Sequence, residues 1–336
     1  MQDAGINIVN YVRFHHLLRL KSADQIFCLP ITMTKSVYLI AFIWIFSFRA
    51  LSQGCSDAGF CSLGALKNSP LTDQPKHQFD IGFNFGYGEQ QTLTYNPYLQ
   101  YGVRLNNQLQ LQAKLTATYA TGFLGSNTNI GDLYGVATYT ITKNKVNNIS
   151  LVGGVKIPLT TANDKDANGL ALPLDYQSSL ATYDFIGGVN YVLLNHLEVD
   201  AALQLPVIQN NQNTFFPDEH TEARIKYFPP TNHLHRQPDG LVRLGYYFNL
   251  PYAISVKPNL LAIYRLGFDS YTSRAGEKTT LTGTGGLTLN EGVTLTKQFK
   301  NHNQVEIIAA MPLISKTVDD GLIREWILNV QYSFAF

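Results

Sequence analysis

The chain has 336 residues, of which 15% are charged, and its formal net charge is +1. This charge gives no electrostatic reason to expect a nucleic acid as partner, because phosphate binding needs a concentrated basic surface. An average soluble protein is about 25% charged, whereas this chain is rich in Gly, Tyr and Phe, with 26, 19 and 19 copies. The composition therefore favours strands and turns over helices.

Residues 33–52 have the pattern of a secretory signal peptide. Lys35 follows Met33, an apolar run occupies residues 37–48, and Ala50-Leu51-Ser52 is a small-x-small cleavage site. The apolar run is shorter than the roughly 20 residues that a membrane-spanning helix needs. We therefore predict export with cleavage after Ser52.

The segments on either side of this signal have no domain character. Residues 1–32 precede the better start at Met33, and we interpret them as an over-extended start. Residues 53–77 are a polar lead-in, predicted to be a flexible periplasmic segment or a partial plug of a barrel.

Two cysteines lie in this lead-in. An oxidising compartment would allow a disulfide between Cys55 and Cys61, and two unpaired thiols are the alternative. Lipidation of Cys55 is a second alternative, which the bulky Gln53 disfavours.

From residue 79 onward, apolar and polar residues alternate, and a strand sends successive side chains to opposite faces. In residues 93–105 the odd positions carry Leu, Tyr, Pro and Val, and most even positions carry polar residues. Residues 109–119 repeat the pattern after a tight turn at Asn106-Asn107.

Continued along the chain, this alternation predicts strands at residues 79–88, 92–106, 108–120, 130–142, 149–160, 179–194, 197–209, 240–249, 254–269, 279–299, 304–314 and 321–336. Short turns such as 195–196 alternate with longer segments such as 121–129 and 210–239. This is the plan of a transmembrane barrel. The predicted fold of residues 78–336 is all-β, a transmembrane antiparallel up-and-down β-barrel of about 12 strands.

Charged residues of both signs occupy the face opposite the apolar stripe of each strand. The rest of that face is mostly Gln, Thr, Asn and Gly, which suits a confined lumen better than the exposed face of a soluble sandwich. The predicted lumen-lining residues are Asp80, Arg104, Lys114, Asp132, Lys156, Asp184, Glu198, Asp200, Arg243, Lys257, Arg265, Glu306 and Glu325. Glu291, Lys297 and Arg324 break the register, and we expect them near strand ends, at bulges or in a shifted frame.

The chain ends in an alternating aromatic strand with Tyr332, Phe334 and a terminal Phe336. This resembles the signal by which outer-membrane barrels are recognised for insertion. It implies the barrel-assembly machinery and outer-membrane lipid as partners, and the outer membrane of a Gram-negative bacterium as the location.

Several motifs resemble one family of outer-membrane barrels. They are Gly131-Asp132-Leu133, the run 153–160, Leu172-Pro173, Gln177 and the run 183–191. The chain resembles transporters of the phenol-degradation pathway, which are related to the fatty-acid transporter superfamily. It departs from their Thr-Gly corner, where Leu159-Thr160-Thr161 stands instead. The resemblance implies passage of small, often hydrophobic or aromatic, molecules through the barrel.

The predicted function is an outer-membrane channel or transporter for passive passage of a small-molecule solute. Phe215 and Phe216 would form an apolar capture patch in the longest loop, or would pack that loop onto the barrel rim. A structural or adhesive barrel that acts through the 210–239 loop is the alternative.

Cofactors are not expected, with one exception. Asp164, Asp166, Asn168 and Asp175 have the oxygen-ligand spacing of a calcium loop, with Gly169 for the sharp turn. An ordinary polar surface loop is the competing interpretation.

Histidines raise two further alternatives. His220, His233 and His235 share a loop with acidic residues, which suggests either a metal site or scattered surface histidines. An outer-membrane hydrolase would need a nucleophile beside His196 or His302, and the sequence has no Gly-x-Ser-x-Gly motif. We therefore predict that the protein is not an enzyme.

Overall fold

The computed structural model describes residues 75–144, 146–316, 318 and 324–336. The predicted start, signal peptide and nearly all of the lead-in, with Cys55 and Cys61, lie outside the described residues. The described residues contain four short 3-10 helices, η3 (Glu89–Gln91), η4 (Leu174–Tyr176), η5 (Pro217–Glu219) and η6 (Ala223–Tyr227). In the part of the chain that the structure describes, no helix is long and apolar enough to cross a membrane.

One large antiparallel sheet contains most of the strands. They are β1 (His77–Gly88), β2 (Leu93–Arg104), β3 (Leu109–Gly122), β4 (Gly125–Lys143), β5 (Asn147–Pro158), β6 (Thr182–Leu193), β7 (Leu197–Gln209), β8 (Asp239–Tyr246), β9 (Phe248–Leu250), β10 (Ile254–Arg265), β13 (Gly286–Gln298), β14 (Gln304–Ile314) and β15 (Arg324–Ala335). A separate hairpin consists of β11 (Ser270–Thr272) and β12 (Lys278–Thr280).

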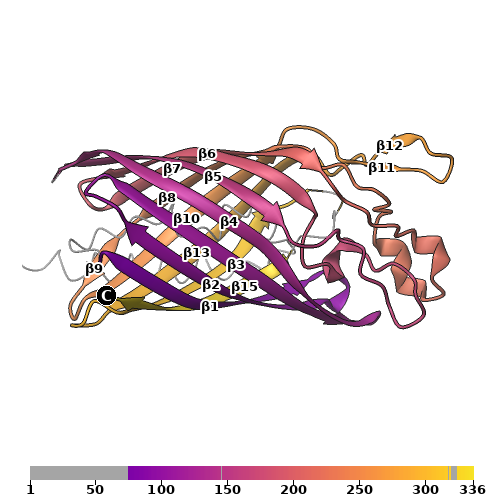
Figure 1. Cartoon of the computed structure of the whole chain (residues 1–336), viewed down its shortest axis with the longest axis horizontal. Helices are drawn as coiled ribbons and strands as arrows, with labels where there is room; N and C mark the ends of the chain where they lie inside the picture. The colour runs from indigo at the N-terminus through magenta and orange to yellow at the C-terminus, as the bar shows by residue number, and fades with distance from the viewer. Residues whose placement is uncertain (1–74, 145, 317, 319–323) are drawn as a thin grey trace, which may run out of the picture. The chain divides into compact units, whose positions relative to one another are not determined.

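The sheet closes on itself as an up-and-down barrel (Figure 1). β1 pairs with β15, and β10 pairs with both β8 and β13. β8 and β9 are separated only by Tyr247 and both pair with β10, so the 13 strands of the sheet form a barrel of twelve. Closure leaves no open edge, because every barrel strand has two neighbours. The predicted fold class and strand number are confirmed.

The two ends of the barrel differ. The start of β1 and the end of β15 lie at one end, together with short connections such as that between β6 and β7; we call it the turn end. The opposite end, the loop end, carries loop A (159–181), loop B (210–238) and loop C (266–285), which contains the β11–β12 hairpin (Figure 1).

The structure corrects several predicted boundaries. Residues 121–129 do not form a long loop, because β3 and β4 pair as far as Gly122 and Gly125. Gly125 adopts a positive φ of 103°, which glycine tolerates and which closes the turn after Phe123 and Leu124. The strand predicted at 254–269 ends at Arg265, and the one predicted at 279–299 begins at Gly286.

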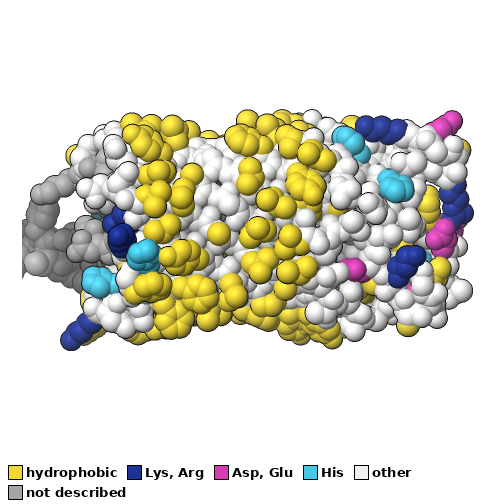
Figure 2. Space-filling view, in the orientation of Figure 1, with side chains coloured by type: hydrophobic (Ala, Val, Ile, Leu, Met, Phe, Trp, Pro, Cys, Tyr) yellow, Lys and Arg dark blue, Asp and Glu magenta, His cyan; other side chains and the backbone are white. Residues whose placement is uncertain are grey.

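Side-chain exposure alternates along the strands. In β5, Ser150, Val152 and Lys156 are buried, whereas Leu151 and Val155 are 44% and 46% exposed. Buried positions face the barrel interior, and exposed positions face outward. Apolar side chains cover the middle of the visible outer face, and charged ones lie toward its ends (Figure 2).

Candidate solute pathway in the barrel interior

The structure places most of the predicted lumen residues on the inward face. Those that are at most 8% exposed are Asp80, Lys114, Asp132, Lys156, Asp184, Glu198, Asp200, Arg243, Lys257, Arg265 and Glu306. Arg104 is half-buried near the turn end, and Glu325 is exposed beside a bulge in β15, where a lumen-lining position was predicted. The charges do not form one cluster but separate into groups.

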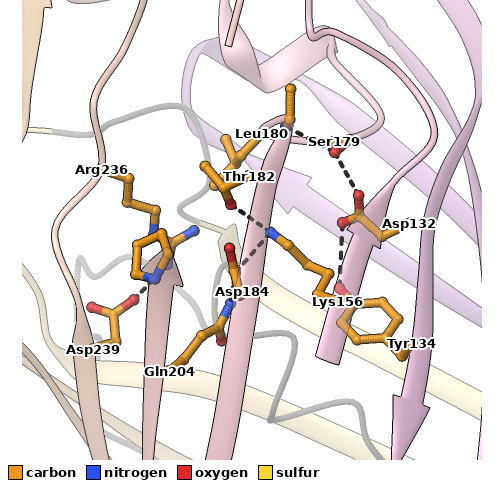
Figure 3. A network of polar contacts seen from close by, with 12 residues as sticks. Asp132, Tyr134, Lys156, Ser179, Leu180, Thr182, Asp184, Gln204, Arg236 and Asp239 are labelled. Carbon is orange, nitrogen blue, oxygen red and sulfur yellow. Dashed lines mark hydrogen bonds and ion pairs between the residues drawn. The ribbon is translucent and has the colours of Figure 1, made fainter. Parts of the chain in front are cut away.

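One polar group joins β4, β5, β6 and β7 to loop A (Figure 3). Lys156 Nζ lies 2.9 Å from Asp184 Oδ2 and donates to Thr182 Oγ1 at 2.9 Å. Gln204 also donates to Asp184. Ser179 Oγ in loop A donates to Asp132 Oδ1 at 2.5 Å. Loop A is thus tied to the interior wall through a buried carboxylate.

A second group lies at the loop end of β8 and β10, where Figure 3 shows Arg236 beside Asp239. Arg236 Nη2 lies 2.5 Å from Asp239 Oδ2, and Arg265 Nε lies 3.0 Å from Asp239 Oδ1. Arg265 Nη1 also reaches Asp269 Oδ2 at 2.6 Å. All four side chains are at most 2% exposed, so two cations and two anions compensate each other away from water.

The third group connects β7, β8 and β10 closer to the turn end. Arg243 Nη2 lies 2.7 Å from Asp200 Oδ2 and 3.2 Å from Glu198 Oε1. Lys257 Nζ lies 2.8 Å from Glu198 Oε2 and donates to Tyr247 Oη at 3.2 Å. These pairings follow the strand register, in which Asp200 lies opposite Arg243.

Amide side chains dominate the wall formed by β15, β1 and β2. Tyr98 Oη donates to Gln331 Oε1 at 2.8 Å, and Asn329 Nδ2 donates to Asn84 Oδ1 at 2.6 Å. Lys114 Nζ stands 3.9 Å from the centre of the Tyr98 ring, within cation–π range. We call Asn84, Tyr98, Asn329 and Gln331 the amide row.

The ring of Tyr98 reaches β15 because it crosses β1 at Gly82. A Cβ atom at Gly82 would collide with that ring. Next to this crossing, Gln100 Nε2 donates to Asp80 Oδ2 at 2.6 Å. Gly82 therefore sets the position of the amide row.

An apolar band, which was not predicted from the sequence, crosses the opposite wall. Its members pack together, and each is at most 8% exposed; they are Tyr134, Val136, Val152, Ile186, Ala202, Leu241 and Leu261. The signal was present, because several strands have two consecutive apolar residues, such as Leu151-Val152 and Leu260-Leu261. In a strand, one residue of such a pair must face inward. The interior wall therefore has an apolar side and an amide side.

The three long loops pack together into a loop cap with two apolar cores. One core contains Tyr176, Phe215 and Phe228, and the other contains Leu174, Leu234 and Leu281. Phe215 is fully buried, so it cannot belong to an exposed capture patch, while Phe216 is half-buried under Arg274. Phe215 packs inside the first core of the cap instead.

Asn213 of loop B holds the cap together by hydrogen bonds. Its Nδ2 donates to Ala162 O at 2.8 Å and to Leu172 O at 3.0 Å, both in loop A. Its Oδ1 accepts from Phe215 N at 2.8 Å and from Thr231 Oγ1 at 2.9 Å. The side chain is fully buried, so its loss would leave several groups unsatisfied.

Two titratable groups of the cap have displaced pKa values. Burial raises the pKa of Tyr176, whose hydroxyl accepts from Leu124 N at 3.3 Å. Partial burial, and then the charge of Lys278, lowers the pKa of His235. His235 joins loops B and C through backbone hydrogen bonds with Ser270 at 2.7 and 3.1 Å.

The four predicted calcium ligands are not brought together in the described residues. Asn127 and Asn129 donate to the two oxygens of Asp164 at 2.8 and 2.9 Å, and Asp166 Oδ1 accepts from the backbone of Asn168 and Leu170. Asp175 is buried elsewhere, among the cap residues of η4. Within the ranges that the structure describes, no group of three or more His, Cys, Asp or Glu side chains could hold a metal ion.

Two of the three loop histidines of the predicted metal site lie against backbone oxygens instead. His220 Nε2 lies 3.0 Å from Ala171 O, and His233 Nδ1 lies 3.2 Å from Asn211 O.

At the other end of the barrel, the terminal aromatic residues lie on β15 and beyond. Phe336 and His77 exchange two backbone hydrogen bonds of 3.0 Å, which seal β15 to β1. Tyr332 and Phe334 face outward beside each other, with ring centres 4.6 Å apart.

Together, the apolar outer face, the closed sheet and the polar interior define the class of outer-membrane β-barrels. No family model and no curated protein matches the sequence. Among solved structures, the COG4313 outer-membrane channel from Pseudomonas putida F1 is similar, with a TM-score of 0.57, 13% identity, and coverage of 80% of this chain and 98% of that one.

Other outer-membrane proteins have lower scores. The CymD monoaromatic hydrocarbon channel has a TM-score of 0.42 and 10% identity, with 86% of this chain and 99% of that chain covered. The KdgM porin has a TM-score of 0.41 and 10% identity, with 77% and 99% covered. At these identities the likeness supports the fold alone.

Proposed function

We propose that this protein is a channel of the Gram-negative outer membrane through which small molecules pass passively. The observation that carries the proposal is the contrast between the two faces of a closed barrel. The outward face is apolar and can contact lipid. The inward face holds polar and charged side chains, which would be costly to place against hydrocarbon, so the interior is suited to a polar content rather than to lipid.

The proposal includes the route to the membrane. Residues 33–52 would direct export and be removed, and the aromatic strand ending at Phe336 would be recognised by the barrel-assembly machinery. The turn end would then face the periplasm, because both ends of the barrel sequence lie there. The loop cap would face the outside.

The solute that fits best has an apolar body and a polar group, as a hydroxylated aromatic compound does. The apolar band would contact the ring, and the amide row with Lys114 would bind the polar group. This solute class agrees with the family resemblance. No enzymatic activity is proposed.

Flux into proteoliposomes tests this proposal. A hydroxybenzoate and a sugar acid of similar size should both enter vesicles that contain the folded protein, with the aromatic solute entering faster. Val152→Thr adds a hydroxyl to the apolar band at nearly constant volume, and it should lower the ratio of aromatic to sugar flux several-fold. Val155→Thr, on the outward face of the same strand, is the matched control and should leave the ratio unchanged.

A structural or adhesive barrel is the second candidate, and the compact loop cap is the observation that favours it. A cap with two apolar cores and a buried hydrogen-bond hub presents a defined surface for contact. Folded protein that transports neither solute and binds cells or matrix through the cap would support this candidate over the channel.

A further inference from the structure

Glu291 differs from every other residue near it on the outer face of the barrel. The outward positions of β13 are Leu287, Leu289, Glu291, Val293 and Leu295, so the carboxyl group lies at the middle of the strand. Its partners across the neighbouring strands are Leu260 on β10 and Met311 on β14. An acidic side chain is thus surrounded by apolar ones at mid-depth of the proposed membrane span.

No other charged residue shares this situation in the described strands. Away from strand ends, their remaining outward positions carry no Asp, Glu, Lys or Arg. Lys297 lies next to the last residue of β13, and Arg324 is the first residue of β15, as expected for residues that break the register. Glu291 lies far from both ends of its strand but beside a register shift of the β13–β14 pair, between Leu289 and Asn290, as expected for a residue at a bulge.

The carboxyl group of Glu291 lacks a partner within the described part of the chain. No hydrogen bond or ion pair reaches it, and the side chain is only 8% exposed, whereas the facing Leu260 is 43% exposed. A polar group next to hydrocarbon is costly unless it is hydrogen-bonded. Retention of an acid at this position therefore indicates a partner from outside the chain.

We propose that the outward face of β10, β13 and β14 around Glu291 packs against the same face of a second copy of this protein. In a two-fold interface each residue near the axis meets its own counterpart. Two Glu291 carboxyl groups would then hydrogen-bond to each other, since a protonated carboxyl both donates and accepts.

Three features favour a second copy as the partner. The described outer face has no basic residue at the depth of Glu291. If the second copy docked through a different part of its wall, Glu291 would therefore have no side chain with which to pair. Ala262 and Ala309 lie diagonally beside Glu291, and small residues allow two surfaces to approach closely in a membrane. The outward aromatic residue on these three strands is Tyr264 of β10, which lies opposite Leu287 toward the loop end, while others such as Phe83 and Trp326 lie on other strands.

Disulfide cross-linking tests the interface. In the full-length chain with Cys28→Ser, Cys55→Ser and Cys61→Ser, a single Glu291→Cys variant in lipid vesicles should form a covalent dimer on oxidation. Leu151→Cys, an outward position on the distant strand β5, is the matched control and should not. Equal cross-linking of both variants, or none at Glu291→Cys, would overturn the proposal.

Self-association measured by energy transfer between labelled copies gives an independent test. Glu291→Gln keeps a donor and an acceptor and should still associate, whereas Glu291→Leu should associate about tenfold more weakly, as expected when a hydrogen bond in an apolar medium is lost. Heat-modifiable gel mobility verifies that both variants are folded. Association of Glu291→Leu as tight as that of the unmodified protein would contradict the paired carboxyl groups.

Discussion

Replacement of Lys156 by Met is the sharpest test of the ion-paired interior. The Lys156–Asp184 pair has a separation of 2.9 Å, and its side chains are 3% and 0% exposed. At an effective dielectric constant of about 20, two charges at this distance attract by about 6 kcal/mol. Loss of the cation would leave Asp184 with Gln204 as its one remaining hydrogen-bond donor among the described residues.

The measured cost of such a change is smaller than the Coulomb energy, because the desolvation of both groups offsets part of it. Breaking a buried pair by removal of one partner costs about 3–5 kcal/mol. We expect Lys156→Met to lower the free energy of unfolding by that amount. Replacement of both residues, Lys156→Met with Asp184→Leu, should recover part of that loss, since Asp184 no longer remains without its cation, while the buried Asp132 still loses the attraction of Lys156.

Urea titration of the refolded protein in lipid vesicles measures both variants, with the fluorescence of Trp326 on the outer face of β15 as the signal. The reasoning would be refuted by a single variant that unfolds within about 0.5 kcal/mol of the unmodified protein, which is the range of an ordinary surface substitution. It would also be refuted by a double variant that is less stable than the single one.

Three further predictions concern the amide row and the loop cap. Gly82→Ala should destabilise the barrel by about 1–3 kcal/mol through overpacking against Tyr98, and Tyr98→Leu in the same chain should relieve most of that loss in urea titrations. Asn213→Ala should make the cap sensitive to limited proteolysis while the heat-modifiable mobility of the barrel stays unchanged, because the lost hydrogen bonds join loops rather than strands. Since the folded-state pKa of His235 lies below the ordinary value of 6.5, the unfolded cap binds more protons, and cap stability should fall as the pH drops below about 6.5; the protection factor of the Ser270 amide, which corrects for the intrinsic pH dependence of exchange, should fall on acidification, and His235→Gln should abolish that fall.

The period-two alternation was sufficient to predict the architecture. A strand sends successive residues to opposite faces, so Leu151 and Val155 on the lipid side and Lys156 on the inner side follow from sequence alone. Strand number follows from the same count. Boundaries were less predictable at turns, because the polar residues after Gly125 resemble a loop although they continue the β4 ladder.

The pairing of interior charges could not be predicted in the same way. Lys156 and Asp184 lie on adjacent strands joined by a long loop, and their contact depends on the register that loop A and the ladder set together. The part that charged loop residues play in the interior was not predicted for a related reason. Arg236 and Asp269 lie outside the strands, yet the closed barrel brings both into the group around Asp239 and Arg265.

The apolar band shows how one strong pattern hid a weaker one. Leu260 and Leu261 were both attributed to a strand with an apolar face, but the second of them faces inward. A consecutive apolar pair in a barrel strand is therefore a sign of an apolar interior position. Glu291 is another exception to the alternation, because an acid occupies an outward position where leucine or valine is expected.

Single-channel conductance in planar bilayers tests the central claim most directly. The refolded chain, and a variant without residues 53–74, which keeps His77 and the seal between β1 and β15, would be compared with the Asn213→Ala variant. A channel predicts discrete conductance steps, with larger or more frequent openings when the cap is loosened by Asn213→Ala. Folded and inserted protein that conducts no ions in any of these forms would contradict a diffusion channel.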